Sequence, residues 1–354
     1  MKIGLILPGN IWFSPYVTIY TKILNDNKIE YDLISWNRDG RDLKMGYQYD
    51  DRIDNTASRL KKLLSYIRYC SFIKKTVKRN NYDKLIVFGP QIGIFISNFL
   101  KKNYKNKYIF DYRDLSIEQN VFFKYPFIEV LKNSYVNVVS SPGFISCLPD
   151  GFDYILSHNF NIELVRQVLC DNTSITLPKD NICVLTIGGI RDYSSNIEIV
   201  KSLSNKEGFV MQFVGKGYAA DLIKDYVITH NIANVEFEGY YPKEKEGGYI
   251  QNASFLNIFY PRKLSHDTAL SNRFYNALIY RRPMIVTKGT TQGDYIEQYQ
   301  LGLSIEDGDN LEMKIRNFLS TLNDDIFSNR CNDLLLLFMK DYNKFEGKIH
   351  DFLV

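Results

Sequence analysis

Short apolar runs that end in glycine or proline alternate with amphipathic stretches along the first half of the chain. The run at residues 2–8 ends in Pro8 and Gly9, and the run at residues 83–88 is followed by Gly89 and Pro90. Short apolar runs closed by turn residues are typical of buried strands. The same pattern predicts strands at residues 29–36, 107–110 and 136–140, and helices at residues 58–79 and 91–101.

The second half of the chain repeats this alternation. Two such series predict an α/β protein with two doubly wound, Rossmann-like parallel-sheet domains, at residues 1–158 and 159–354. The boundary is expected near His158 and Phe160, before an irregular stretch to about Asn181. The strands are predicted at residues 182–187, 209–214, 235–238, 255–260 and 283–287, and helices at residues 195–203, 218–230 and 329–350. We expect the last helix to pack back toward the N-terminal domain.

Ligands of open parallel sheets bind beyond the carboxyl ends of the strands. We therefore expect the two sheets to face each other across a cleft. One wall would hold Gly9, Asn10 and residues 111–114, and the other would hold residues 188–191, 215–217 and 239–240.

Composition narrows the class of protein. Of 354 residues, 45% are hydrophobic and 24% charged, which is ordinary globular usage. The five cysteines are an odd number, widely scattered and without a Cys-x-x-Cys pair. This argues against a disulfide framework or a zinc cluster and for a reducing compartment. No apolar run is long enough for a signal peptide or a membrane span, so we expect a cytoplasmic protein that is at most membrane-peripheral.

The positive charge is concentrated in the first half. Residues 1–157 hold 23 Lys/Arg against 15 Asp/Glu, and residues 55–82 hold eight basic residues and no acidic one. The basic helix at residues 59–79 can lie on an anionic membrane surface, and its alternative is a solvated helix. No nucleic-acid-binding motif accompanies it. Its main apolar face is predicted at Leu60, Leu63, Leu64, Ile67, Cys70, Ile73 and Val77, and a second, aromatic stripe at Tyr66, Tyr69 and Phe72.

Two glycine pairs follow predicted strands of the second half. Gly188 and Gly189 come directly before Ile190 and Arg191, and Gly215 and Gly217 flank Lys216. Glycines after a strand let the backbone approach an anion, and an arginine offers a planar fork to phosphate oxygens. The alternative interpretation of each pair is a tight turn.

A second candidate is the segment that contains Ser271, Asn272 and Arg273. Ser271 is a plausible N-cap, so a helix would begin there with free backbone amides that favour a diphosphate. A cation in the first turn is unfavourable to a helix, which raises the odds that Arg273 binds an anion rather than solvent.

A third candidate is the charged strand end at Asp111, Arg113 and Asp114. Either an Asp–Arg pair supports the loop, or Asp114 or Arg113 faces the acceptor or the reaction centre. Among the histidines, His158 is expected to make a hydrogen bond at the domain junction, and His266 could reach a ligand. No cluster has metal-ligand spacing, and no nucleophile elbow of the Gly-x-Ser-x-Gly type occurs.

These motifs, in this order, resemble the GT-B glycosyltransferases of family 4, which act in bacterial capsule, O-antigen and exopolysaccharide assembly. The resemblance is carried by three segments. They are the Gly-Gly-x-Arg segment that ends at Arg191, residues 271–286 with their Ser-Asn-Arg-aromatic start, and the Asp-x-Arg-Asp segment that ends at Asp114.

The resemblance implies transfer from a nucleotide-diphosphate sugar, UDP- or GDP-linked, with retention of configuration and without metal or another cofactor. Arg191 and Arg273 would hold the diphosphate, with Asp114 also catalytic. Gly188, Gly189, Gly215, Gly217, Tyr240, Ser271, Asn272 and Asn276 would bind the donor, while Gly9, Asn10 and Arg113 would lie on the side of a saccharide or lipid-linked acceptor.

Many members of this family carry two glutamates eight positions apart, where this chain has Thr268 and Asn276. An asparagine can hydrogen-bond a ribose hydroxyl but cannot supply the charge-assisted bond of a carboxylate. Two alternatives to a transferase therefore stay open. One is a non-catalytic protein that binds a nucleotide sugar or a partner, and the other is a sugar-nucleotide epimerase.

Overall fold

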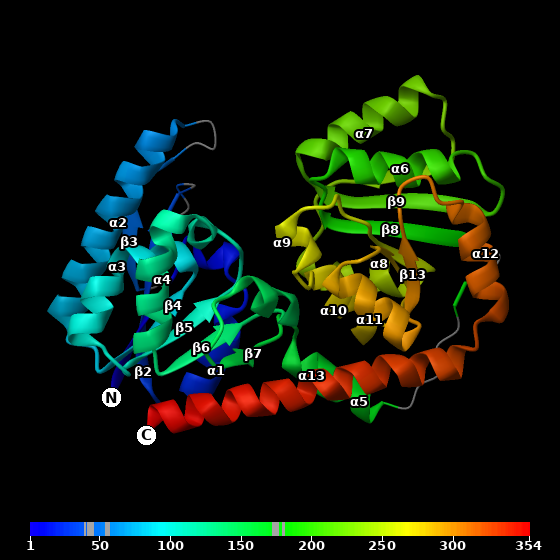
Figure 1. Cartoon of the computed structure of the whole chain (residues 1–354). Coiled ribbons are helices and arrows are strands. Elements are labelled where there is room, and N and C mark those ends of the chain that lie inside the picture. The colour runs from blue at the N-terminus through cyan, green and yellow to red at the C-terminus, as the bar shows by residue number, and fades with distance from the viewer. Residues whose placement is uncertain (39, 41–45, 54–56, 172–176, 179–180) are drawn as a thin grey trace. The chain divides into compact units, whose positions relative to one another are not determined.

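The computed structural model of the chain (Figure 1) describes residues 1–38, 40, 46–53, 57–171, 177–178 and 181–354. The chain divides into two compact units. Unit 1 comprises Met1–Asn159 and Asp341–Val354, and unit 2 comprises Phe160–Lys340. Each unit contains one all-parallel sheet whose successive strands are joined mostly through helices. The predicted α/β class with two doubly wound parallel sheets is therefore confirmed.

Unit 1 has a seven-stranded sheet in the order β3-β2-β1-β4-β5-β6-β7. All five strands predicted here are present, whereas β3 and β7 were not predicted. Both are short edge strands. β3 is a half-exposed Tyr-Gln-Tyr-Asp segment, and β7 is a three-residue Tyr-Ile-Leu segment with one buried side chain, so neither gives a long apolar run. The strands are β1 (Lys2–Ile6), β2 (Glu30–Asn37), β3 (Tyr47–Asp50), β4 (Lys84–Phe88), β5 (Tyr108–Tyr112), β6 (Val136–Val139) and β7 (Tyr154–Leu156).

The helices α2, α3 and α4 of unit 1 form one layer (Figure 1). Ring contacts join them, from Tyr66 to Phe95 and from Phe95 to Phe123. The sequence did not predict α4, which contains Pro126. The helices are α1 (Val17–Asp26), α2 (Arg59–Asn80), α3 (Pro90–Asn103) and α4 (Val121–Asn133), and the 3-10 turns are η1 (Ile11–Phe13), η2 (Ile117–Gln119) and η3 (Pro142–Cys147).

The two stripes of α2 correct the sequence prediction. The aromatic stripe faces inward: Tyr69 is buried, its hydroxyl donates to the carbonyls of Leu7 (2.6 Å) and Ile34 (3.1 Å), and its ring lies 5.1 Å from that of Trp36. A tyrosine satisfies strand-end carbonyls that an aliphatic side chain would leave unpaired. The first two turns of the predicted main apolar face point outward instead. Leu60, Leu63, Leu64 and Ile67 are between 42% and 66% exposed.

Unit 2 has a six-stranded sheet in the order β10-β9-β8-β11-β12-β13. The five predicted strands are present, and only the edge strand β13 was missed. The strands are β8 (Ile182–Gly189), β9 (Phe209–Lys216), β10 (Val235–Glu238), β11 (Phe255–Ile258), β12 (Met284–Thr287) and β13 (Gly302–Ile305).

The helices of unit 2 follow most of its strands. The helix α5 occupies the start of the predicted irregular stretch after Phe160, while residues 172–176 and 179–180 of that stretch lie outside the described residues. The helices are α5 (Ile162–Cys170), α6 (Tyr193–Leu203), α7 (Tyr218–Thr229), α8 (Glu246–Asn252), α9 (Leu264–Asp267), α10 (Asn272–Ile279), α11 (Thr291–Tyr299) and α12 (Leu311–Thr321), and the 3-10 turn is η4 (Lys243–Lys245).

The last helix, α13 (Asp324–Leu353), belongs to both units. Within unit 2 the ring of Phe338 lies 6.4 Å from that of Phe274. Within unit 1 the ring of Phe345 meets that of Tyr20 edge-on at 5.2 Å. The final turns of the chain thus complete the core of unit 1.

His158 makes a hydrogen bond within unit 1, between its Nε2 and Oδ2 of Asp341 on α13, at 3.0 Å. Burial lowers the pKa of this imidazole, although Asp341 opposes the shift. A neutral imidazole that donates to a carboxylate accounts for His158 as a structural residue.

Close backbone packing explains the second glycine pair. Gly215 has φ +131°, and a Cβ there would lie 2.0 Å from the carbonyl oxygen of Gly188. A Cβ on Gly217 would lie 1.9 Å from the carbonyl oxygen of Ile190. Only glycine lets the end of β9 approach β8 this closely.

We expect Gly215→Ala to lower the free energy of unfolding by about 1–3 kcal/mol, because the new Cβ meets backbone that cannot move aside. Urea unfolding measures the change. Gly347→Ala is the matched control, because that glycine lies within α13 with open space around its Cα. It should be neutral or stabilise by up to ~1 kcal/mol. Equal stability of the Gly215 variant and the wild type would show that the strand ends separate freely.

Candidate active site

The carboxyl end of β8 lies beside the beginnings of two helices. After Gly189 the chain passes through Ile190 and Arg191 into α6, and Gly188 has a positive φ of 93°. The side chain of Ser271 caps α10 by accepting a hydrogen bond from the amide of Phe274, so the predicted N-cap is confirmed. Helix beginnings at the carboxyl edge of a sheet favour bound anions.

Arg273 connects the beginning of α10 to the ends of two strands. Its guanidinium donates to the carbonyl oxygens of Ile187, Gly189 (2.9 Å) and Asn257 (3.3 Å). Its Cζ lies 5.7 Å from the ring centre of Tyr260. The cation is therefore fixed at the carboxyl edge of β8 and β11.

Arg191 is exposed and lies beside Gly189, the glycine whose carbonyl oxygen accepts from Arg273. A Cβ on Gly189 would be 3.3 Å from Nε of Arg191, while the carbonyl oxygen of Gly189 accepts from Arg273. The structure thus brings these two predicted residues together at one strand end. Whether they bind phosphate stays a prediction.

Further cations surround this strand end. Lys216 pairs with Gly189 in the register of β9 and β8 and is exposed, and Lys263 lies 3.9 Å from Asp192. Sequence reasoning did not single out Lys263, because one basic residue in a predicted loop carries no periodic signal. Arg191, Arg273, Lys216 and Lys263 thus lie at or near this strand end, and cations there attract anionic ligands.

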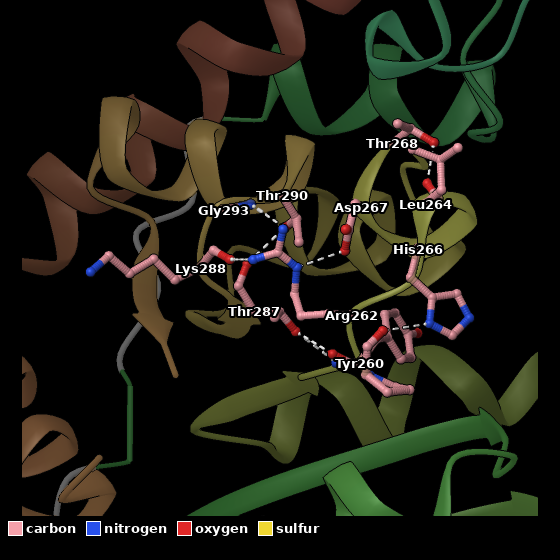
Figure 2. Close-up of polar contacts among 11 residues, drawn as sticks. Tyr260, Arg262, Leu264, His266, Asp267, Thr268, Thr287, Lys288, Thr290 and Gly293 are labelled. Atoms are coloured by element: carbon pink, nitrogen blue, oxygen red, sulfur yellow. Dashed lines mark hydrogen bonds and ion pairs between the residues drawn. The ribbon is translucent and has the colours of Figure 1, made fainter. Parts of the chain in front are cut away.

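Arg262 holds the loop after β11 in place through hydrogen bonds, as Figure 2 shows. Its Nε donates to Oδ1 of Asp267 at 2.9 Å, and its Nη1 donates to the carbonyl of Lys288 at 3.1 Å. The loop's Tyr260 amide also donates to Oγ1 of Thr287 at 2.9 Å. Sequence reasoning missed Arg262, whose partners are up to 26 residues away.

The same loop holds Thr268 and His266 (Figure 2). The hydroxyl of Thr268 donates to the carbonyl of Leu264 at 2.7 Å, and the side chain is buried. Nδ1 of His266 lies 3.0 Å from the carbonyl of Pro261, and its ring lies 5.4 Å from that of Tyr260. His266 therefore packs near the ring of Tyr260, which also lies near Arg273.

A carboxylate that sequence reasoning missed gathers three donors near Gly188. Glu246 on α8 accepts from the hydroxyl of Tyr241 (2.9 Å), from Nδ2 of Asn276 (3.1 Å) and from Nζ of Lys243. Burial and the Glu246 carboxylate raise the pKa of Tyr241. The alternating Lys-Glu-Lys-Glu segment at residues 243–246 is typical of a solvated surface, so its sequence did not predict a functional role for Glu246.

Tyr240 and Asn272 both present exposed side chains in unit 2. Tyr240 is 76% exposed, two residues after the end of β10, and Asn272 is the exposed first residue of α10. Their predicted contact with a donor stays untested.

In unit 1 the charged strand end forms a buried ion pair. Nε of Arg113 lies 2.6 Å from Oδ1 of Asp111, and Nη2 donates to Oδ2 at 2.7 Å, so both carboxylate oxygens contact the guanidinium. The remaining donors reach the carbonyl (2.9 Å) and hydroxyl (3.1 Å) of Ser157, and the hydroxyl of Tyr20 donates to Asp111 at 2.6 Å. This is the pair that supports the loop, the first of the two predicted alternatives.

Asp114 follows the pair and is exposed at the carboxyl edge of β5. Partial desolvation raises the pKa of its carboxyl, and Arg113 opposes the rise. At the end of β1, Gly9 has open space where a Cβ would be, and Asn10 is buried with its Nδ2 3.4 Å from Oδ1 of Asn37. These residues share one edge of the sheet with Arg113.

Across the described ranges, no group of three or more His, Cys, Asp or Glu side chains is placed to hold a metal ion. None of the helices in those ranges combines the length and apolar character that crossing a bilayer requires.

No protein-family model matches the sequence, and no curated protein matches it significantly. Solved structures do match over the whole chain. Sucrose-phosphate synthase from Thermosynechococcus elongatus has a TM-score of 0.74 at 15% identity, covering 100% of this chain and 99% of that one. The lipopolysaccharide outer core galactosyltransferase WaaB has a TM-score of 0.68 at 14% identity, covering 99% of each chain.

The Anabaena protein HepE, solved in complex with UDP, has a TM-score of 0.66 at 11% identity and covers 99% of each chain. At these identities a structural match establishes the arrangement of helices and strands and leaves the chemistry open. With its two Rossmann-like units and these neighbours, the chain has the GT-B fold of glycosyltransferases.

Proposed function

We propose that the protein is a retaining glycosyltransferase that moves a sugar from a nucleotide-diphosphate sugar to a saccharide acceptor. The observation that carries the proposal is the meeting of Arg191 and Arg273 at Gly189, beside the beginnings of α6 and α10. Two guanidinium groups and two helix beginnings suit a diphosphate. HepE, a protein with the same fold, was solved with UDP, which supports a uridine-linked donor over a guanosine-linked one.

In this proposal the arginines act on the leaving group. As the bond between the anomeric carbon and the diphosphate breaks, negative charge grows on the departing oxygen, and fixed cations stabilise it. Arg273 is held by three carbonyls before substrate arrives, so little reorganisation is needed. We propose that the reaction is independent of metal because the two guanidinium groups can supply this positive charge.

We propose that Tyr240 frames the nucleobase and that Asn276 reaches the ribose. Glu246 orients the Asn276 amide by accepting a hydrogen bond from its Nδ2. The Oδ1 atom of the same amide can then accept a hydrogen bond from a ribose hydroxyl. Glu246 is then a positioning residue. Its carboxylate, on α8, contacts position 276, where many members of the resembled family have a glutamate and this chain has an asparagine.

We expect Glu246→Gln to weaken nucleoside diphosphate binding by about tenfold or more, since a charge-assisted hydrogen bond contributes ~1.5–3 kcal/mol. Calorimetry of UDP binding measures the effect. Glu244→Gln is the control, because Glu244 is exposed in the turn just before α8. Unchanged binding by the Glu246 variant would remove Asn276 and Glu246 from the proposed donor site.

We propose that the acceptor binds unit 1, with Asp114 at the acceptor hydroxyl. An exposed carboxylate with a raised pKa is a better base than an ordinary aspartate. Gly9 and Asn10 would lie beside the acceptor, and Arg113 would hold the loop through its pair with Asp111. We further propose that the acceptor is lipid-linked, that the enzyme works at the inner face of the cell membrane, and that its product is a surface polysaccharide.

The proposal is tested by binding and turnover on the full chain. Thermal-shift measurements with UDP, GDP and ADP identify the nucleotide, because a ligand at 100 times its Kd stabilises the folded state by about 2.7 kcal/mol. Transfer or hydrolysis from the matching nucleotide sugars is then followed with EDTA present, and the anomeric configuration of the product by NMR. We expect turnover with retention. Binding without turnover on any donor and acceptor would indicate a non-catalytic binding protein, and an isomerised nucleotide sugar would indicate an epimerase.

A further inference from the structure

The first turns of α2 and α4 expose large apolar side chains on one surface of unit 1. On α2 the exposed side chains recur at positions i, i+3, i+4 and i+7, so they form one stripe on the outer face of the helix. On α4 the exposed side chains are 69% to 83% exposed. We call this surface the apolar patch. It consists of Leu60, Leu63, Leu64 and Ile67 of α2 and Val121, Phe122 and Tyr125 of α4.

Ring contacts connect the helices that carry the patch. Tyr66 of α2 lies 6.1 Å from Phe95 of α3, and Phe95 lies 6.1 Å from Phe123 of α4. Figure 1 shows the three helices side by side. This row of half-buried rings therefore packs α2, α3 and α4 together as one layer.

The charges around the patch are of one sign. Lys61 and Arg68 are exposed beside the stripe of α2, and Lys124 is exposed between the apolar residues of α4. No acidic residue occurs at residues 57–82 or 121–128. Apolar side chains rimmed by cations are complementary to a bilayer that exposes anionic headgroups over an apolar interior.

The patch lies at a defined edge of the unit. A helix that follows a parallel strand begins at the carboxyl edge of the sheet, so the first turns of α2 and α4 lie at the edge that holds Gly9 and Asp114. A lipid-linked acceptor whose tail stays in the bilayer would present its saccharide to that edge.

We propose that the apolar patch docks unit 1 on an anionic bilayer, with Phe122 and Leu64 inserted among the lipids and Lys61, Arg68 and Lys124 against the headgroups. This assignment stands on unit 1 alone. Its consequence, delivery of a lipid-linked acceptor to Asp114, rests on the proposed function. The contact is not made by Tyr66, Tyr69 and Phe72, which the sequence suggested, because these rings face inward.

Co-sedimentation of the full chain with vesicles tests the proposal. We expect binding to phosphatidylcholine vesicles that contain about 30 mol% phosphatidylglycerol, weak binding to phosphatidylcholine alone, and loss of binding as NaCl rises from about 0.1 M to about 0.5 M. The double variant Leu64→Ser/Phe122→Ser should weaken binding about tenfold or more, since two large apolar side chains no longer insert. Lys61→Glu/Lys124→Glu should abolish the preference for phosphatidylglycerol.

The matched control is Leu222→Ser/Ile228→Ser, which removes two apolar side chains that are at least half exposed from α7 of unit 2. It should bind vesicles like the wild type. Hydrolysis of the donor without vesicles should be the same in every variant, so failure of docking and failure of the proposed function are separated. A wild type that does not sediment with anionic vesicles would overturn the proposal, and so would a dimer in solution that the Leu64/Phe122 variant breaks, which would assign the patch to a second copy of the chain.

Discussion

Arg191→Ala is expected to lower the rate of sugar transfer by about 10²–10³, the scale of one lost electrostatic donor at a developing negative charge. The thermal unfolding midpoint should stay that of the wild type, because the Arg191 side chain is exposed. Initial rates with saturating donor measure the effect. Arg191→Lys should recover part of the rate, since it restores the charge without the planar fork.

Arg273→Ala should show a similar loss of rate together with a loss of stability. Its guanidinium satisfies the carbonyls of Ile187, Gly189 and Asn257, and these acceptors would lose their donor. Lys224→Ala, an exposed change on α7, is the control for removal of a surface cation. Wild-type turnover in both arginine variants would refute the proposal that Arg191 and Arg273 bind the diphosphate, and with it the proposed donor site.

Asp111→Asn is expected to lower the free energy of unfolding by about 3–5 kcal/mol, because it leaves the charge of Arg113 buried without a partner. The neutral amide cannot replace the ion pair, and the hydroxyl of Tyr20 loses a charged acceptor. Urea unfolding at neutral pH measures the change. Asp26→Asn is the control: its pair with Lys22 is exposed on α1, so its loss should cost under ~1 kcal/mol.

A double variant distinguishes the cost of an unpaired buried charge from the cost of changing the two side chains. Asp111→Leu/Arg113→Leu removes both charges and should recover much of the lost stability, since a buried ion pair is often replaced by apolar residues without large cost. If Asp111→Asn instead unfolds at nearly the wild-type urea concentration, the guanidinium must reach solvent, and Arg113 would be available to an acceptor.

The sequence predicted the central strands of both sheets because each has a local signal. Apolar runs such as residues 83–88 and 182–187 are closed by glycine, and this pattern needs no distant partner. The N-cap at Ser271 was predicted for the same reason, since a capping side chain bonds an amide three residues away. The edge strand β3 was missed because it has only four residues, none of them buried, and only one neighbour, β2, holds it.

The periodicity of α2 was recognised, and Cys70, Ile73 and Val77 of the predicted apolar face are buried, but the orientation of its first two turns was not predicted. A helical period marks stripes of side chains without saying which stripe meets the sheet. The hydroxyl of Tyr69 decides the matter by bonding carbonyls of β2 and the end of β1, and these acceptors exist only in the assembled unit. Exposure of Leu64 and its neighbours follows from that choice.

By itself the sequence determined an α/β chain with two parallel sheets and placed Arg191 and Arg273 at strand and helix ends. It did so because strands, glycines and caps are encoded within a few residues. Only the tertiary structure decided that both arginines share Gly189, that Glu246 holds Asn276 across 30 residues, and that Asp111 and Arg113 form a buried pair. Those contacts depend on distances between segments far apart in the chain, and no local pattern records such distances.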